Sequence, residues 1–201
     1  MSNLRFIAVV GGSGSGKSWL AANIGKQLGP EAGHLCLDDF YRDLGHLPEE
    51  ERDGVNFDDP AAIDWDALRV VLECLERGDA ARIPIYDFAT HTRMPESRDF
   101  ENAGLVVLEG LWLLHPEWLR GKFAVSVFVD CPEEERLRRR IERDGLARGR
   151  TEESVRRQFA DHVQPMHARF VEPQRQWATR RVNSPMSETE HAELVSACLG
   201  C

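Results

Sequence analysis

The sequence lacks the features that mark several large classes of protein. It has no apolar run near the roughly 20 residues that a membrane-spanning helix needs. Its first apolar stretch starts at Phe6, so we expect no secretory or transit segment. Internal repeats and low-complexity tracts are also absent. We therefore expect a cytoplasmic protein without a membrane partner.

Cysteine is scarce, and the charge balance is acidic. The five cysteines, at positions 36, 74, 131, 198 and 201, form an odd and scattered set without metal-ligand spacing, so we expect reduced thiols. A net charge of −9 argues against general nucleic-acid binding. The Asn-Lys-x-Asp and Asp-x-x-Gly motifs of a regulatory GTPase do not occur. With 42% hydrophobic residues, the chain can bury one α/β core, and we expect a single domain over residues 1–201.

A glycine-rich stretch, GGSGSGKS, begins at residue 11 and is either a flexible linker or a binding loop. The apolar run at 6–10 predicts a buried strand before it, and apolar residues at every fourth position over 20–28 predict a helix after it. A linker does not join a core strand to an amphipathic helix. The spacing Gly-x4-Gly-Lys-Ser is that of a phosphate-binding loop, whereas a dinucleotide fingerprint would need glycine where Lys17 stands.

Each residue type in this loop suits a triphosphate. Glycines let successive backbone N–H groups turn toward phosphate oxygens, and the positive end of the following helix points at the same anion. Lys17 adds a mobile positive charge, and the hydroxyl of Ser18 can bind Mg²⁺. The ATP-binding residues that we predict in the loop are Gly11, Gly12, Ser13, Gly14, Ser15, Gly16, Lys17 and Ser18.

Strands and helices alternate along the rest of the chain. We expect further strands at 34–37, 105–110 and 123–130, and helices that begin after Asp64, Pro132, Thr151 and Ser187. A polar insertion over 40–60 and a small extended excursion over 81–99 interrupt the alternation. The pattern predicts a P-loop NTPase-type doubly wound parallel sheet flanked by helices.

Two carboxylates follow predicted strands. Asp38 comes after the strand at 34–37, and Glu109 lies at the end of LVVLEG, so both should face the phosphate-binding loop. Phosphoryl transfer needs Mg²⁺ near the phosphates and a group that accepts a proton from the attacking hydroxyl. These two carboxylates and Ser18 are candidates for both tasks. The alternative is that the carboxylates cap strands or pair with arginines.

Many stretches of the chain resemble the uridine kinase (uridine–cytidine kinase) family, which is related to phosphoribulokinase. The matching stretches occur in the family's order over residues 5–178: GGSGSGKS, DDFYR, NFDDPAAIDWDAL, IPIYDFATHTR, VVLEG, RLRRRIERD, RGR and PMHARFVEPQRQWA. The resemblance implies ATP-dependent transfer of the γ-phosphoryl group to the 5′-hydroxyl of uridine or cytidine in pyrimidine salvage, with Mg²⁺ as cofactor. It also implies a homo-oligomer, either a tetramer or a dimer.

The resemblance assigns roles to single residues. Asp38 would be the catalytic base and would join Ser18 and Glu109 around Mg²⁺. The substrate-binding residues would be Asp38, Tyr41, Asp58, Tyr86, His91, Arg143 and Gln158. Of these, Tyr86 and His91 would address the base. From the residues alone, Tyr86 is equally a strand aromatic, and His91 is equally a loop residue without a role.

Arginine is concentrated in one segment. Residues 136–157 contain nine arginines and four acidic residues, although the whole chain is acidic. A solvated helix face or an RNA-binding patch is the simpler explanation, and the first is what we expect of Arg138, Arg156 and Arg157. Glycines at 145 and 149 are candidate hinges of a lid that swings arginines over a triphosphate, and in the uridine kinase family this region is the lid. The functional subset that we expect is Arg140, Arg143, Arg148 and Arg150, with the first two catalytic.

The chain departs from the uridine kinase pattern in two places. Asp39 replaces the serine that usually follows the catalytic aspartate, and nicotinamide riboside kinases carry aspartate there. The stretch from TRRVNS onward does not follow the family's usual ending. A nicotinamide riboside kinase, or a kinase of another small hydroxyl compound, is therefore the alternative function.

Overall fold

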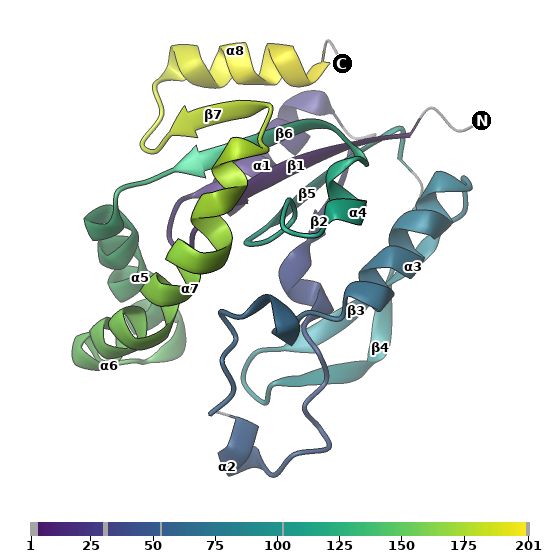
Figure 1. Ribbon diagram of the computed structural model, residues 1–201. Helices are drawn as coiled ribbons and strands as arrows, with labels where there is room; N and C mark the ends of the chain where they lie inside the picture. Colours follow the sequence, from purple (N-terminus) through teal and green to yellow (C-terminus); the bar gives the residue numbers. More distant parts are fainter. Residues whose placement is uncertain (1–3, 30–31, 53, 102, 200–201) are drawn as a thin grey trace.

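A five-stranded parallel sheet forms the centre of the computed structural model, which describes residues 4–29, 32–52, 54–101 and 103–199 (Figure 1). Its order is β2-β5-β1-β6-β7, and every neighbouring pair runs parallel. The strands are β1 (Arg5–Gly11), β2 (Ala32–Cys36), β5 (Leu105–Gly110), β6 (Phe123–Asp130) and β7 (Arg180–Asn183). The predicted doubly wound parallel sheet is confirmed.

Helices cover both faces of this sheet because its strands are apolar on both sides. Along β1, alternate residues enter two separate cores: Phe6, Ala8 and Val10 pack with α3 (Trp65–Glu76), and Ile7 and Val9 pack with α1 (Lys17–Leu28) and α8 (Glu188–Leu199). The buried helix positions follow the predicted stripes. None of the helices in the described ranges is long and apolar enough to cross a membrane.

The segment after β2 differs from the prediction. The strand ends at Cys36 rather than at residue 37, and Leu37–Phe40 form the 3₁₀ helix η1, because this turn buries Leu37 and Phe40 in the core. Asp38 therefore lies on a tight turn beyond the strand. The polar insertion that follows contains two short helices, α2 (Glu49–Arg52) and η2 (Pro60–Ala62). The excursion over 81–99 is confirmed as an antiparallel hairpin of β3 (Ala81–Asp87) and β4 (Thr92–Phe100), which lies below the main sheet in Figure 1.

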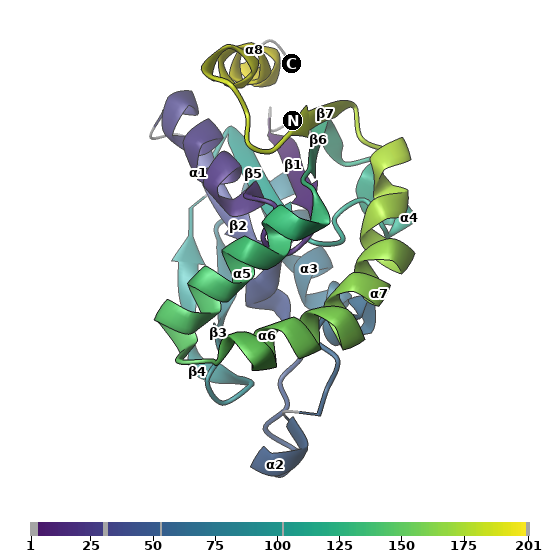
Figure 2. The ribbon, with the colours of Figure 1, turned by 90° about the vertical axis from the view of Figure 1, so that its left-hand side faces the viewer.

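The arginine-rich segment forms two helical arms joined by a short turn (Figure 2). The first arm is α5 (Glu133–Arg148). The second arm begins with α6 (Glu152–Gln158) and ends with η5 (Glu172–Gln176). Between them come the π-helical turn η3 (Phe159–Val163), the helix α7 (Gln164–Met166) and the π-helical turn η4 (His167–Val171). Thr151 caps the second arm as predicted, since its hydroxyl accepts a hydrogen bond from the N–H of Ser154. Of the two candidate hinges, Gly145 is a helical residue of α5, and Gly149 adopts a left-handed backbone at the helix end (φ 62°).

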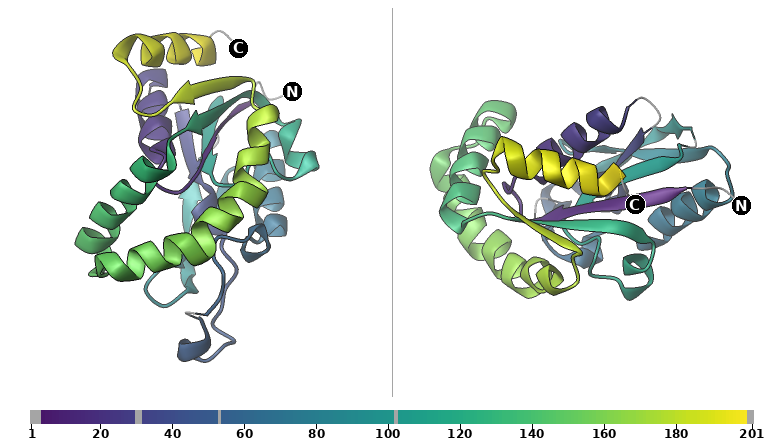
Figure 3. Two further views of the ribbon diagram at one scale, coloured as in Figure 1. Left: turned by 60° about the vertical axis from the view of Figure 1, so that its left-hand side comes forward. Right: turned by 90° about the horizontal axis from the view of Figure 1, so that it is seen from above.

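The arms lie beyond the carboxyl ends of the strands, at the opposite end of the molecule from the N-terminus (Figure 3). The short helix α4 (Glu117–Arg120) follows β5. The chain ends with β7 and α8, so a strand and a helix do close the fold although this part of the sequence looked unlike the family. The predicted capping box is confirmed: Ser187 and Glu190 exchange hydrogen bonds at the start of α8.

Candidate active site

The glycine-rich loop between β1 and α1 has the backbone shape that a phosphate needs. Gly14 and Gly16 have positive φ values of 79° and 91°, which residues with a side chain rarely adopt. Gly16 precedes the first turn of α1, and its carbonyl accepts the N–H of Leu20. Lys17 and Ser18 open the helix and are partly or fully exposed. The loop thus presents backbone N–H groups, one cation and one hydroxyl at a helix N-terminus.

The back of the loop is packed against the two arms. A Cβ at Gly12 would lie 2.7 Å from Nδ1 of His167, and one at Gly14 would collide with the carbonyl oxygen of Arg136. Burial, and then the charge of Arg136, lowers the pKa of His167 to about 4, so this imidazole is neutral. No partner of His167 could be predicted from the sequence. Its position shows that the second arm holds the loop from behind.

The two predicted carboxylates meet at the carboxyl edge of the sheet. Cys36 is paired with Glu109 in the β2–β5 register, and its thiol donates a hydrogen bond to Oε1 of Glu109 at 3.3 Å. Glu109 is almost fully buried. Burial raises the pKa of Asp38 to about 6; the ammonium of Lys17 opposes this rise, and the charge of Glu109 adds to it. Asp38, Glu109 and Lys17 therefore interact electrostatically, as the sequence predicted.

The donors present here fit Mg²⁺. Carboxylate oxygens of Asp38 and Glu109 and the hydroxyl of Ser18 are the hard oxygen ligands that this ion prefers. Oδ1 of Asp38 is buried and has no hydrogen-bond partner among the described residues, so it needs a ligand. In the described ranges no group of three or more His, Cys, Asp and Glu side chains could hold a metal by itself. Kinase Mg²⁺ sites have this character, because phosphates and water supply the other oxygens.

An aromatic cluster includes Tyr41, whose pKa is raised by burial and then by the charge of Asp38. Phe57 stacks on His91 with ring centroids 4.2 Å apart, and Tyr41 lies between Phe57, Tyr86 and Phe88 at 5.4–6.4 Å. The Tyr41 hydroxyl is engaged with the carbonyl of Phe57. The Tyr86 hydroxyl is buried without a partner in the described part of the chain. The structure thus brings the predicted residues Tyr41, Tyr86 and His91 together.

Sequence reasoning missed Phe57. It lies in the irregular insertion, where no periodicity marks a buried position, although it is part of the NFDDP stretch. The ring of Phe57 stacks on the imidazole of His91 and so holds it against the cluster. The backbone of His91 is left-handed (φ 55°), which histidine tolerates better than most residues.

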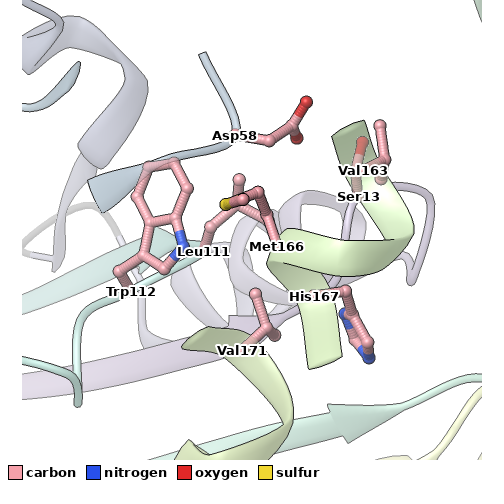
Figure 4. A pocket seen from close by; sticks show the side chains of 8 residues that line it. All are labelled: Ser13, Asp58, Leu111, Trp112, Val163, Met166, His167 and Val171. Atoms are coloured by element: carbon pink, nitrogen blue, oxygen red, sulfur yellow. The ribbon is translucent and has the colours of Figure 1, made fainter. Parts of the chain in front are cut away.

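Asp58 lies between the aromatic cluster and the arms. It lines a small pocket, together with Ser13, Leu111, Trp112, Val163, Met166, His167 and Val171 (Figure 4). Burial raises the pKa of Asp58, and the charges of Arg140, His162, Lys17 and Arg143 oppose the rise. A carboxylate in this position can accept hydrogen bonds from substrate hydroxyls.

Exposure follows the predicted division of the arginines only in part, because Arg143, which was expected to be functional, is 46% exposed. Arg138 and Arg156 are exposed and pair with glutamates of their own helices, and Arg157 is exposed. In contrast, Arg140 is buried and donates to Oγ of Ser13 at 2.6 Å. Arg143 donates from Nε to Oδ1 of Asp144 at 2.8 Å. The side chain of Arg148 lies outside the described part of the structure, as does Cys201.

Gln158 lies between two arginines, and its expected place near the ribose stays a prediction. Its Oε1 accepts hydrogen bonds from Arg140 and Arg150. Arg150 also donates to Oγ of Ser154. The reason is local: the turn at Gly149 brings the start of α6 back onto the end of α5, so these side chains meet each other.

Asp39, the departure from the uridine kinase pattern, faces the hairpin. Its Oδ2 accepts a hydrogen bond from Nη2 of Arg98 on β4 at 3.0 Å. The carboxylate is therefore engaged in tying η1 to the hairpin.

Comparisons with known proteins agree with this site. The profile of the Phosphoribulokinase / Uridine kinase family matches residues 6–189. A uridine kinase of Chloroflexus aurantiacus is 40% identical over 173 residues, which cover 86% of this chain and 83% of that protein. A uridine kinase of Staphylococcus haemolyticus is 40% identical over 179 residues, which cover 89% and 86%.

Solved structures show the same fold at lower identity. A putative fructose transport system kinase from Silicibacter sp. TM1040 has a TM-score of 0.75 at 22% identity and covers 89% of each chain. Phosphoribulokinase from Rhodobacter spheroides has a TM-score of 0.68 at 19% identity, covering 91% of this chain and 71% of that one. With the family profile, the 40% identical relatives and the P-loop site in agreement, the chain belongs to the Phosphoribulokinase / Uridine kinase family and is a kinase of a nucleoside or another small molecule.

Proposed function

We propose that the protein is an ATP-dependent uridine/cytidine kinase of pyrimidine salvage that acts as one domain. The observation that carries the proposal is the place of Asp38, between the phosphate-binding loop and the aromatic cluster. Lys17 of the loop acts on the pKa of Asp38 from one side, and Tyr41, three residues further on, belongs to the cluster on the other. The names of the two relatives that are 40% identical support the same acceptor.

In this proposal Asp38 is the general base. It takes the proton of the 5′-hydroxyl while that oxygen attacks the γ-phosphorus, and the bond from the γ-phosphorus to the β–γ bridging oxygen breaks to release ADP. A pKa of about 6 suits the task, because the group is ionised at neutral pH and is still a better base than an ordinary aspartate. Lys17, Arg140 and Arg143 supply positive charge for the phosphoryl group in transit.

We also propose that Ser18, Asp38 and Glu109 hold Mg²⁺ and that Arg148 and Arg150 help to bind the triphosphate. When bound, the ion would neutralise charge on the phosphates and hold them in place. The chain's own contribution is to fix the ligands. Cys36 restrains Glu109 through its hydrogen bond, and the turn of η1 fixes the backbone of Asp38.

The aromatic cluster is the proposed site of the pyrimidine. Flat rings of Tyr41, Phe57 and Tyr86 can stack on a planar base. The buried hydroxyl of Tyr86 offers a hydrogen bond to it, and the imidazole of His91 can donate or accept according to its tautomer. Asp58 would accept hydrogen bonds from the ribose hydroxyls.

The pairing of Asp39 favours the pyrimidine acceptor over the alternative. In a nicotinamide riboside kinase we would expect this extra carboxylate to act on a cationic ring, yet here it is held by Arg98 at 3.0 Å. An ion pair of this kind neutralises the charge that a cationic acceptor would use.

The test is a phosphorylation panel with the purified protein and either ATP or GTP. The acceptors are uridine, cytidine, adenosine, nicotinamide riboside and 5′-deoxyuridine, which lacks the attacking hydroxyl, and products are separated by chromatography. We expect the 5′-monophosphates of uridine and cytidine and no product from 5′-deoxyuridine. If nicotinamide riboside is phosphorylated and neither uridine nor cytidine is, the alternative function replaces this proposal.

A further inference from the structure

A buried carboxylate that has no role in the reaction proposed above lies between the two catalytic arginines. Asp144 is the residue after Arg143 and lies one helical turn beyond Arg140 on α5. Its side chain is completely buried. Oδ1 accepts a hydrogen bond from Nε of Arg143 at 2.8 Å, and Oδ2 lies 3.8 Å from Nη2 of Arg140.

The carboxylate is costly to bury and therefore depends on these cations. A buried ionised group is tolerated only when it is paired and hydrogen-bonded. In return, its negative charge lowers the repulsion between the guanidinium groups of Arg140 and Arg143. The carboxylate and the two guanidinium groups stabilise each other, which explains why an acidic residue occurs inside an arginine-rich helix.

The two arginines depend on Asp144 to different degrees. Arg140 has two further anchors, Oγ of Ser13 at 2.6 Å and Oε1 of Gln158 at 3.1 Å. The side chain of Arg143 is 46% exposed, and its bond to Asp144 is made through Nε. A guanidinium that is held at Nε keeps both terminal nitrogens available for another ligand. Arg143 also acts on Asp38 and Asp58, since its charge lowers the pKa of each.

The backbone of Asp144 makes a separate contribution. Its carbonyl oxygen accepts the N–H groups of Gly149 and Arg150 and so ends α5. These bonds do not involve the side chain and persist in any substitution that keeps the helix. A change from carboxylate to amide at this position therefore tests the charge alone.

We infer that Asp144 is a positioning residue for the phosphoryl transfer, which holds Arg143 at Nε so that its terminal nitrogens face the phosphoryl group in transit. The inference rests on the proposed function, because it takes Arg143 as one of the groups that stabilise the transferred charge. It differs from that proposal in assigning a role to a residue that touches neither substrate nor nucleotide.

The experiment is a double-mutant cycle in the full chain. It compares the parent, Asp144→Asn, Arg143→Ala and the double variant, with Glu142→Gln as the control. Glu142 lies on the same helix but is exposed and pairs with Arg138. We expect Asp144→Asn to lower kcat/KM about ten- to a hundred-fold and Glu142→Gln to change it less than twofold. The double variant should be no slower than Arg143→Ala, because Asp144 acts through that arginine.

A second readout does not need turnover. In a ¹H–¹⁵N spectrum, the Nε–H of Arg143, identified by its loss in Arg143→Lys, should be protected from exchange in the parent and unprotected in Asp144→Ala, which has no side-chain acceptor. Additive effects in the cycle, or an Nε–H that stays protected in Asp144→Ala, would overturn the inference. If the parent phosphorylates no pyrimidine nucleoside while the protection is lost as expected, the proposed function fails and the positioning of Arg143 by Asp144 stands.

Discussion

Nη1 of Arg140 donates a hydrogen bond to Oγ of Ser13 across 2.6 Å, so the first arm touches the phosphate-binding loop through a buried arginine. The same guanidinium donates to Gln158 of the second arm. One side chain thus joins the loop to both arms. Because charged hydrogen bonds in buried places are stronger than those in water, this contact fixes a positive charge beside the phosphate site.

This contact predicts a large difference between arginines of the same segment. Arg140→Ala should lower kcat about a hundred-fold or more, since it removes a fixed charge beside the transferred group. Arg156→Ala should change kcat less than twofold, because Arg156 is exposed and paired with Glu152. Initial rates with saturating ATP and uridine measure both. Small and equal changes of kcat in the two variants would show that the arginines of this segment form only a solvated surface.

The loop lysine gives a second prediction. Lys17→Ala should lower kcat by about three orders of magnitude and leave the fold intact, because Lys17 is outside both cores. Lys26→Ala, an exposed lysine on the same helix, is the matched control and should be fully active. Circular dichroism checks the fold of each variant. A folded Lys17→Ala protein with normal turnover would exclude the loop from the mechanism.

Local patterns were enough to predict most of this fold. The strand before the loop, the stripe of α1, the caps at Asp64 and Thr151 and the hairpin over 81–99 depend on neighbours in the sequence, and all are confirmed. β7 was missed because an edge strand of four residues with one half-buried side chain, Val182, carries no clear alternation.

Contacts between distant segments could not be predicted in the same way. Nothing in the sequence places Phe57 on His91 or Arg98 on Asp39, because each pair joins an irregular loop to another part of the chain. Gly145 was named as a candidate hinge from its residue type, and its place inside a continuous helix could not be predicted from that. The hydrogen bonds of Gln158 with Arg140 and Arg150 likewise depend on the turn at Gly149, and its assignment to the ribose by resemblance stays a prediction.

The pKa of Asp38 predicts how the rate depends on pH. The base must be ionised to accept a proton, so kcat/KM should rise with pH and level off above an apparent pKa of about 6. Asp38→Asn keeps the size of the side chain and should lose turnover severely while retaining nucleoside binding, which calorimetry measures. If Glu109→Gln were inactive and Asp38→Asn nearly normal, the roles of base and metal ligand would be exchanged.

The same carboxylate should destabilise the folded protein at neutral pH. Its pKa rises from 3.8 to about 6 on folding, so the folded state binds the proton more tightly and loses stability as the pH rises through this interval. Asp38→Asn cannot ionise and should be more stable than the parent at pH 7, by up to about 3 kcal/mol. Below pH 4 the two should converge. Urea unfolding at both pH values measures this, and a gain of equal size at pH 4 and pH 7 would show that the ionisation of Asp38 is not its cause.

The last prediction concerns the acceptor base. Uracil presents an acceptor at O4 and a donor at N3, whereas cytosine presents a donor amine and an acceptor nitrogen, and a neutral imidazole can serve either by changing tautomer. Loss of a buried hydrogen-bond partner costs on the order of 1–3 kcal/mol. His91→Asn, which suits the left-handed backbone, and His91→Ala should both lower kcat/KM for uridine and cytidine about ten- to a hundred-fold, with KM for ATP unchanged.

His46 provides the matched control for this change, because it is an exposed histidine of the neighbouring insertion. His46→Ala should behave as the parent with both nucleosides. Tyr86→Phe keeps the aromatic wall and removes the buried hydroxyl, so it should raise KM for the nucleoside while leaving KM for ATP unchanged. If the His91 variants handle uridine as well as the parent does, His91 only supports Phe57, and the discrimination of the base must come from Tyr86 and the cluster around it.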